Sequence, residues 1–530
     1  VHFSNIQKFE IEEAPVNHPP FWVDIVGIQG VEPLDSAVSV SFGDADDPDG
    51  DEVVFRIYYA EGETVDPASP LTQALEVPAS SLPPDPPFAV VVSGLTNGIK
   101  YAFMVRVYDE HGLEESPANS VILTAIPFSS ALNPLPWPYF RKDERRSGHS
   151  STSSLTEQLT LLWDRTSGSN PLQLSSVVLD EENVYVVSVH PATGTPAIYA
   201  FAQQDGGVVP GFPAIFGEFG DAVGLSTPAL YQDFIVVGIS GSYEILRRGD
   251  GMRAGQFPLV NQNAVHSSPL IFGGLVFAGS NEGVLYCFNL SGQLVWARPL
   301  KVDIGPLPIT SSPSTDGWFI FAASEEGYVY KLSLGEGQVL ATSPDLGIIR
   351  NSSPVPFSVE GKDYVLICAD LEADKQGLYL LGADDLSVLF HFETELGAIC
   401  TPLVVEKADS AVLVVVGDQH PTQYTLGRVY CLQLDTGSDS LLPAWEYPQR
   451  PNPGDIGGVY SSPIASAERI FVTTERGLLY VFDYNGNVTS QPPIQVGSSG
   501  ERIFTTPAIN GDQLFVVTSV GRVVCFNSAI

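Results

Sequence analysis

The chain is short of basic residues. Lys and Arg number 25 against 62 Asp and Glu, which gives a formal net charge of −37. So little positive charge argues against nucleic acid and anionic membrane surfaces as partners, because both are held mainly by Lys and Arg. Charged residues make up only 16% of the chain, below the ~25% that is usual. The imbalance therefore reflects scarce bases, a pattern typical of secreted or assembled surface proteins.

Long hydrophobic runs are also absent. No apolar run approaches the roughly 18 residues of a membrane helix, so we expect no membrane insertion. The chain begins with Val1 rather than Met, and we expect that a leader has been removed. Together these features predict a secreted, cell-surface or periplasmic protein.

One short sequence motif, here called the phrase, occurs eight times along the last 360 residues or so. Two hydroxyl residues meet a proline, an apolar strand follows, then a Gly-centred turn and a second strand. The clearest copy starts at Ser267-Ser268-Pro269, and one copy has Cys400-Thr401 in place of the hydroxyl pair. Most copies are spaced like the roughly 40–50 residues of a four-stranded propeller blade. The anchor residues are Val177, Pro228, Pro269, Pro313, Pro354, Pro402, Pro463 and Pro507.

The strands between these anchors are short, rich in β-branched and aromatic residues, and bounded by Gly, Asn and Asp, which predicts an all-β protein. Eight copies predict an eight-bladed β-propeller over residues 151–530. The last copy has room for only three strands. Residues 159–163 match the position of an outer strand, so we expect them to complete the last blade and close the ring.

A family resemblance rests on this repeat together with Trp137-Pro138-Tyr139-Phe140-Arg141 and Arg146-Ser147-Gly148. Residues 135–527 resemble the quinoprotein-type, or PQQ-like, eight-bladed propeller. The resemblance implies either a pyrroloquinoline-quinone dehydrogenase or a non-catalytic relative, such as the outer-membrane assembly lipoproteins.

The front of the chain has a different pattern. Residues 1–20 predict an extended arm, and residues 21–126 have the alternating strands and regular turns of a β-sandwich. The stretch Leu95–Phe103 resembles the tyrosine corner of fibronectin type III domains, with Tyr101 as the corner residue. Residues 127–150, rich in Pro, Ser and Arg, are expected to be a linker that leads into the propeller.

Catalytic and cofactor-binding residues of a quinone enzyme are not found in the sequence. Such an enzyme would carry adjacent cysteines, a calcium site and a catalytic Asp. None of the five cysteines is adjacent to another, and we predict that Cys287, Cys431 and Cys525 are free thiols packed in strands. The family's tryptophan-docking phrase survives only in fragments, so Trp296 and Trp445 are interpreted as packing residues of outer strands. We therefore predict no enzyme, no catalytic residue and no resident cofactor.

One acidic run, residues 44–51, leaves a question of calcium binding open. It does not match an EF-hand loop, because Ala45 and Arg56 stand where acids are needed. A looser calcium site in a sandwich loop and a solvated turn between two strands are both consistent with it.

Three hypotheses for function follow. The leading one is a non-catalytic binding or structural protein, with the propeller as a rigid interaction scaffold. Its partners are other proteins or further copies of itself, assembled through the arm at residues 1–20 into an extracellular filament. The first alternative is a quinone- or metal-dependent oxidoreductase. The second is a periplasmic scaffold for outer-membrane protein assembly.

Overall fold

The structure is a computed structural model that describes residues 16–528. The gaps are residues 24, 85, 116–117, 119–120, 128–132, 169–174, 217–225, 261–264, 301–306, 371–374, 408–409, 421–422, 424–425 and 450–455. Most of the predicted arm, residues 1–15, therefore lies outside the described part. The chain divides into two compact units, residues 1–129 and 130–530, and each is described by itself.

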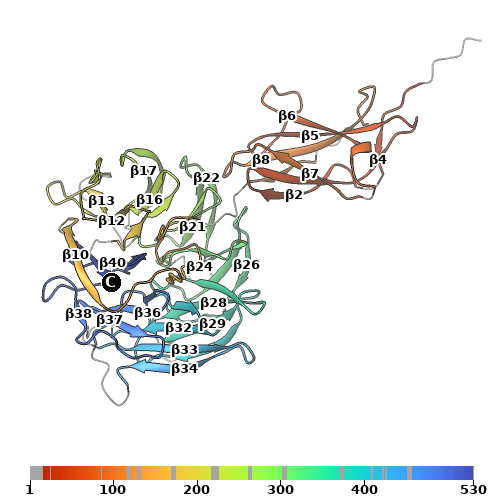
Figure 1. Cartoon of the computed structure of the whole chain (residues 1–530). Helices are drawn as coiled ribbons and strands as arrows, with labels where there is room; N and C mark the ends of the chain where they lie inside the picture. Colours follow the sequence, from red (N-terminus) through yellow and green to blue (C-terminus); the bar gives the residue numbers. More distant parts are fainter. Residues whose placement is uncertain are drawn as a thin grey trace, which may run out of the picture. The chain divides into compact units, whose positions relative to one another are not determined.

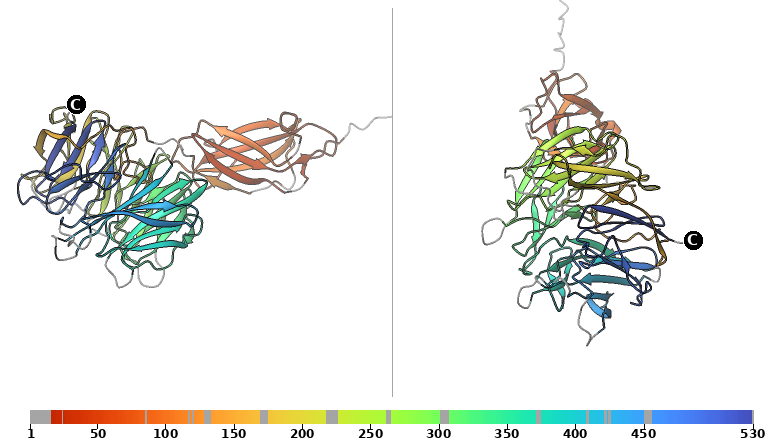
Figure 2. Two further views of the ribbon diagram at one scale, coloured as in Figure 1. Left: turned by 60° about the horizontal axis from the view of Figure 1, so that its bottom comes forward. Right: turned by 90° about the vertical axis from the view of Figure 1, so that its left-hand side faces the viewer.

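The first unit is a β-sandwich built from two antiparallel sheets (Figures 1 and 2). Phe42, Phe55 and Phe103 are fully buried between the sheets, because alternate residues of each strand face inward. The three-stranded sheet consists of β2 (Ile28–Leu34), β3 (Ala37–Phe42) and β7 (Phe88–Ser93). The four-stranded sheet consists of β6 (Gln73–Pro78), β5 (Val53–Glu61), β8 (Tyr101–Asp109) and β9 (Leu123–Ala125). Strands β1 (Phe21–Trp22) and β4 (Ala45–Asp46) form a separate two-stranded sheet.

Tyr101 holds the position expected of a corner residue. It is buried at the start of β8, and its hydroxyl oxygen accepts a hydrogen bond from the Thr96 N–H at 3.2 Å. The bond ties the loop before β8 to the sheet, which is the structural role that the sequence predicts for Tyr101.

The second unit contains, in its described residues, eight four-stranded antiparallel sheets, one for each copy of the phrase. Figure 1 shows them set around a common centre. Blades 1 to 4 are β11 (Val178–Leu179), β12 (Asn183–Val189), β13 (Pro196–Ala202) and β14 (Ala214–Ile215); β15 (Ala229–Tyr231), β16 (Phe234–Ile239), β17 (Ser242–Arg247) and β18 (Arg253–Pro258); β19 (Leu270–Phe272), β20 (Leu275–Gly279), β21 (Val284–Asn289) and β22 (Leu294–Pro299); and β23 (Ser314–Thr315), β24 (Phe319–Ala323), β25 (Val329–Ser333) and β26 (Val339–Thr342).

Blades 5 to 8 follow the same order, except that the last blade takes its outer strand from the beginning of the unit. They are β27 (Val355–Val359), β28 (Lys362–Ala369), β29 (Gly377–Gly382) and β30 (Val388–Glu393); β31 (Leu403–Glu406), β32 (Val412–Gly417), β33 (Val429–Asp435) and β34 (Ser440–Tyr447); β35 (Ile464–Ala465), β36 (Arg469–Thr473), β37 (Leu478–Asp483) and β38 (Ile494–Gln495); and β39 (Ala508–Asn510), β40 (Gln513–Val517), β41 (Arg522–Ser528) and β10 (Leu159–Thr166).

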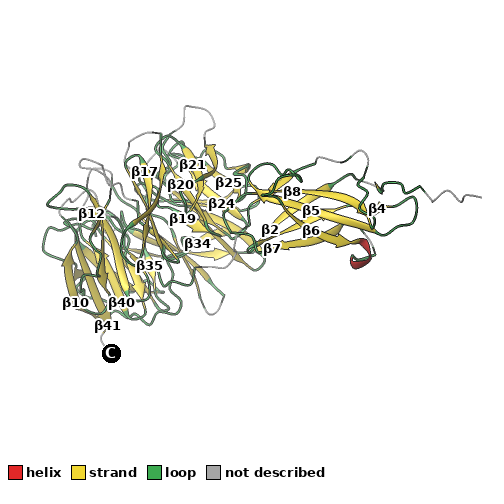
Figure 3. Cartoon of the chain, turned by 90° about the horizontal axis from the view of Figure 1, so that it is seen from above, coloured by secondary structure: helices red, strands yellow, loops and turns green. Residues whose placement is uncertain are grey.

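The all-β class is confirmed. The only helical element in the described residues is a short 3-10 turn, Ala79–Ser81, coloured red in Figure 3. None of the described segments forms a helix with the length and apolar character needed to cross a bilayer. Each anchor residue of the phrase directly precedes the first strand of its blade, where the missing N–H of a proline costs no ladder bond.

Strand β10 closes the ring as predicted. It pairs antiparallel with β41, with Leu159 opposite Ser528 and Trp163 opposite Cys525. An otherwise open sheet edge is thereby covered by the chain itself.

Three tryptophans of outer strands dock onto the next blade. Each indole N–H donates to a carbonyl in the turn between the third and fourth strands of that blade: Trp163 to Gln203 (2.8 Å), Trp296 to Leu334 (3.0 Å) and Trp445 to Tyr484 (3.1 Å). A Cβ added at Gly206, Gly337 or Gly486 would lie 2.5–2.8 Å from the docked ring. The tryptophans therefore join neighbouring blades, which the interpretation of Trp296 and Trp445 as packing residues of outer strands did not include.

Residues 133–150, here called the axial segment, belong to the propeller unit. Their backbone and side chains bond to the first strands of several blades. Trp137 pairs with Leu179, and the Tyr139 hydroxyl donates to the Ile271 carbonyl at 2.6 Å. Three backbone N–H groups also donate to backbone carbonyls: Leu230 to Pro138, Thr315 to Glu144 and Ser150 to Ala465. The sequence predicts a linker and propeller entry over residues 127–150, and residues 133–150 of that stretch bond directly to the blades.

Candidate functional site

The centre of the propeller holds a closed ring of hydrogen bonds, here called the hydroxyl belt. In each blade the N–H of the second hydroxyl residue of the phrase donates to the side-chain oxygen of its counterpart in the next blade. The bonds run from Ser176 to Thr227 (3.2 Å), to Ser268 (2.9 Å), to Ser312 (3.0 Å), to Ser353 (2.9 Å), to Thr401 (3.0 Å), to Ser462 (2.9 Å), to Thr506 (3.1 Å) and back to Ser176 (2.9 Å).

The first hydroxyl residue of the phrase acts within its own blade. In most blades its side chain accepts an N–H from the end of the second strand, as Ser175 does from Val187 at 2.8 Å and Ser311 from Ala323 at 3.1 Å. In blade 6 the Cys400 sulfur takes this place and accepts the Gly417 N–H at 3.4 Å. The pair therefore satisfies backbone groups that would otherwise be buried without partners.

Ser312→Ala is expected to destabilise the propeller by about 1–3 kcal/mol, because the buried Ser268 N–H loses its acceptor. Ser312→Thr keeps the oxygen, as Thr227, Thr401 and Thr506 do in their blades, and should cost much less. Urea unfolding of the two variants measures the difference. Equal destabilisation by the two substitutions would mean that the hydrogen bond from Ser268 to Ser312 does not stabilise the propeller.

A small cavity lies over the belt. Its volume is about 50 Å³, and Phe140 of the axial segment is among its lining residues. Most other lining residues outside the belt come from the position directly before each hydroxyl pair, namely His266, Thr310, Asn351, Ile399, Tyr460 and Phe504. Tyr460 meets Phe504 edge to face at 5.4 Å and accepts a hydrogen bond from the Asn351 amide at 3.1 Å. The cavity is lined by both polar and apolar side chains, several of them aromatic, and is of a size for water.

Glu475 is a buried carboxyl close to Tyr460. It is 5% exposed, and no described group donates a hydrogen bond to its Oε2. Burial raises the pKa of Glu475 to about 7, and the nearby Arg502 guanidinium lowers it only in part. The carboxyl is therefore poised between its neutral and ionised forms near neutral pH.

Glu475 should make stability fall as pH rises. The pKa is raised in the folded state, so the native protein holds this proton more tightly than the unfolded chain, and stability is lost between about pH 4.5 and 7. Glu475→Gln cannot ionise. It should therefore be more stable than the parent at pH 8, by on the order of 1 kcal/mol, and lose this advantage at pH 4. Denaturant unfolding at both pH values measures this, and an advantage that does not change with pH would contradict the argument.

Two arginines of the axial segment are buried at the centre. Arg141 and Arg146 are 1% and 0% exposed. Arg146 donates to the carbonyls of Pro313 and Phe140, both at 3.0 Å, and of Pro269 at 3.2 Å, while Arg141 donates to the carbonyl of Thr401. Burial lowers the pKa of each guanidinium to about 10, so both stay charged at neutral pH. Carbonyls of the phrase thus hold the axial segment in the channel.

All five cysteines are free and buried, and Cys287, Cys431 and Cys525 lie in strands as predicted. Cys368 and Cys400, in neighbouring blades, share a thiol–thiol hydrogen bond. Burial raises the pKa of Cys368, whereas the bond from Cys368 lowers the pKa of Cys400. This proximity is not visible in the sequence, because 31 residues separate the two thiols and only the propeller geometry joins them.

The residues present do not fit a quinone cofactor. Pockets for cofactors are typically about 300–1,000 Å³, whereas the described cavity at the belt holds about 50 Å³. Phe140 of the axial segment lines this cavity, and Arg141 and Arg146 of the same segment are buried.

The acidic run at residues 44–51 forms strand β4 and the turn before β5. Asp47 caps this turn by accepting the N–H groups of Asp49 and Asp51. Asp51, the last acid of the run, lies beside Asp109 and His111. Sequence reasoning missed these two residues, because the antiparallel pairing of β5 with β8 brings them there.

Comparison with known proteins agrees with the fold. Residues 173–343 match a family described as outer membrane protein assembly factor BamB. No curated protein matches the chain. Among solved structures, a europium-containing methanol dehydrogenase is 11% identical, with a TM-score of 0.54, and the alignment covers 74% of this chain and 98% of that one.

Two further structures are similar. The quinohemoprotein alcohol dehydrogenase from Comamonas testosteroni is 11% identical over 74% of this chain and 80% of its own, with a TM-score of 0.52. The C-terminal WD40 domain of Sif2 is 12% identical over 70% of this chain and 99% of its own, with a TM-score of 0.50. These likenesses establish a β-propeller fold and leave activity open.

Proposed function

We propose that the protein is a non-catalytic binding scaffold that works outside the cytoplasm. The observation that carries this proposal is the filled channel: the axial segment occupies the centre where propeller enzymes of the quinone type bind their cofactor. Arg141 and Arg146 are anchored there by carbonyls of several blades. A rigid ring with its centre filled leaves its loops and its outer rim for recognition.

The outer rim of the propeller has features that favour other proteins as partners. Several fourth strands carry apolar side chains that are 37–59% exposed, on strands whose outer edge is unpaired in the described sheets. Exposed apolar groups of this kind favour contacts with other proteins. They are Leu161 and Leu162 of β10, Leu294 of β22, Val339 and Leu340 of β26, Val388 and Leu389 of β30, and Leu442 of β34.

Titration of the full chain with pyrroloquinoline quinone and calcium tests the proposal. A scaffold with a filled channel should show no saturable absorbance change and no shift of the melting temperature. A saturable change of either kind would overturn the scaffold and favour the alternative, a quinone-dependent oxidoreductase.

The family match over residues 173–343 favours a second candidate, a periplasmic scaffold for outer-membrane protein assembly. Depleting the protein in its source should then lower the amount of folded outer-membrane β-barrels, read by their heat-dependent mobility on gels. Unchanged barrels on depletion would rule this candidate out and leave the scaffold proposal standing.

Self-assembly through residues 1–20 is the most specific form of the proposal, with the fibronectin type III-like unit as spacer. Strand β7 of the sandwich, Phe88–Ser93, lies at a sheet edge and has neither charge nor proline, which suits the addition of a strand from another copy. Deleting residues 1–18 should reduce the particle mass measured by light scattering to that of one chain. An unchanged mass distribution would exclude the arm as the joint.

A further inference from the structure

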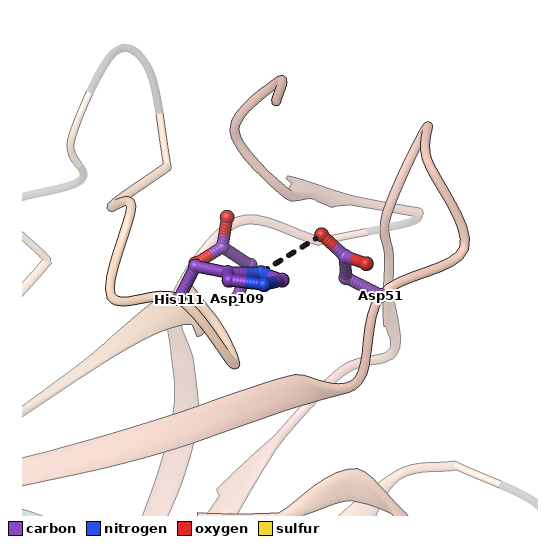
Figure 4. A group of neighbouring side chains, drawn as sticks. All are labelled: Asp51, Asp109 and His111. Atoms are coloured by element: carbon purple, nitrogen blue, oxygen red, sulfur yellow. Dashed lines mark ion pairs between the residues drawn. The ribbon is translucent and has the colours of Figure 1, made fainter. Parts of the chain in front are cut away.

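Three side chains with metal-binding groups meet at one end of the sandwich (Figure 4). Asp51 lies in the turn before β5, Asp109 is the last residue of β8, and His111 follows in the next turn. Strands β5 and β8 pair antiparallel, with Val53 opposite Asp109. The pairing places the turn before β5 beside the end of β8, and thus joins residues 58 positions apart in the sequence.

The spacing of the donor atoms suits a small ion. One ligand atom from each residue lies within 4.8 Å of the other two. His111 Nδ1 lies 3.2 Å from Asp51 Oδ2, and the edge of a tetrahedron with metal–ligand bonds near 2.0 Å is about 3.3 Å. Only a small movement of the Asp109 or Asp51 side chain is needed for all three to share one ion.

Burial and hydrogen bonds hold the site in place. Asp109 is 2% exposed and accepts the Leu113 N–H at 2.7 Å and the Asn17 amide at 2.6 Å. These two hydrogen bonds fix the orientation of the carboxylate, as bonds to the outer side of a metal ligand typically do. His111 is exposed, so one side of the site is open to water.

A second carboxylate of the same acidic turn, Asp47, is buried, and one of its oxygens lacks a hydrogen-bond donor in the described part of the chain. Asp47 is 5% exposed, and its Oδ1 accepts the N–H groups of Asp49 and Asp51, whereas its Oδ2 has no hydrogen-bond partner among the described residues. A buried carboxylate oxygen without a donor is costly. A cation held next to Asp51 would offset part of that cost.

We propose that Asp51, Asp109 and His111 bind a divalent transition metal of the zinc type, with water in the open position. Two carboxylates and one imidazole suit zinc, which takes oxygen and nitrogen ligands in a tetrahedron. Calcium takes 6–8 oxygen ligands, and an imidazole at the site does not suit it. The proposal is independent of the scaffold function.

Calorimetric titration of metal-free full-length protein with Zn²⁺ tests this, and Co²⁺ absorption reports the ligand geometry. We expect one Zn²⁺ per chain and visible Co²⁺ bands of a tetrahedral site. His111→Ala and Asp51→Asn should each weaken binding at least about 10-fold, and circular dichroism checks that both variants remain folded.

His18→Ala is the matched control. His18 is also exposed and pairs with a carboxylate of the same acidic turn, Asp49 at 3.0 Å, but is not one of the three ligands. It should bind Zn²⁺ like the parent. The proposal is overturned by the absence of stoichiometric Zn²⁺ binding, by equal losses in His18→Ala and His111→Ala, or by calcium binding more tightly than zinc.

Discussion

Trp163→Ala is expected to lower the free energy of unfolding by about 3–5 kcal/mol, the range for removing a large buried aromatic side chain. Trp163 is 5% exposed and packs against Phe201 of blade 1 and Phe515 of blade 8. Its indole N–H also donates to the Gln203 carbonyl. The substitution therefore removes packing and a hydrogen bond at the seam where the ring closes.

Trp318→Ala is the control for this prediction. Trp318 lies in the turn between β23 and β24 and is 76% exposed, so its loss should change stability by no more than about 0.5 kcal/mol. Denaturant unfolding compares the two variants with the parent. A loss below about 1 kcal/mol for Trp163→Ala would mean that the closure contributes little to the stability of the ring.

Arg146→Met should be nearly as damaging, at about 3 kcal/mol or more, since each bond from a charged donor contributes about 1.5–3 kcal/mol and each buried carbonyl left unpaired adds a penalty. Methionine retains much of the volume but donates nothing to Pro313, Phe140 or Pro269. The axial segment then loses its main anchor at the centre of the propeller.

Arg145→Met changes the neighbouring residue, whose side chain is exposed, and should stay within about 0.5 kcal/mol of the parent. The free energies of unfolding come from urea titrations monitored by tryptophan fluorescence. Similar values for the two variants would show that the buried guanidinium does not hold the segment in place.

Much of the fold could be predicted from the sequence, because the repeated phrase carries strong local signals. Pro269 before β19 and the apolar strands bounded by glycine predict blades directly, and the count of copies predicts the missing strand that β10 supplies. What the hydroxyls do could not be predicted. Ser267 and Ser268 are alike in the sequence, yet the Ser267 hydroxyl accepts an N–H of its own blade and the Ser268 hydroxyl accepts one from the preceding blade.

The axial segment shows why composition alone misleads. Residues 127–150 are rich in Pro, Ser and Arg, which is typical of linkers. Arg141 and Arg146 are nevertheless buried, because the carbonyls at the start of the first strands point into the channel and require donors. This requirement comes from eight blades meeting at one centre and is not visible in any single stretch of sequence.

The group Asp51, Asp109 and His111 was missed for a similar reason. The acidic run at residues 44–51 is conspicuous, and its sequence was compared with local calcium loops. The partners of Asp51 lie 58 and 60 residues further along the chain, and only the register of β5 with β8 brings them together.

Native-state hydrogen exchange of the axial segment is the most direct test of the central claim, that the chain itself permanently fills its channel. The Ser150 N–H bonds to Ala465 and the Leu230 N–H bonds to Pro138. Both should exchange only through global unfolding, as slowly as the N–H of Val276 in the buried strand β20. Exchange of Ser150 and Leu230 through local opening, orders of magnitude faster than Val276, would show that the channel opens and would contradict the account.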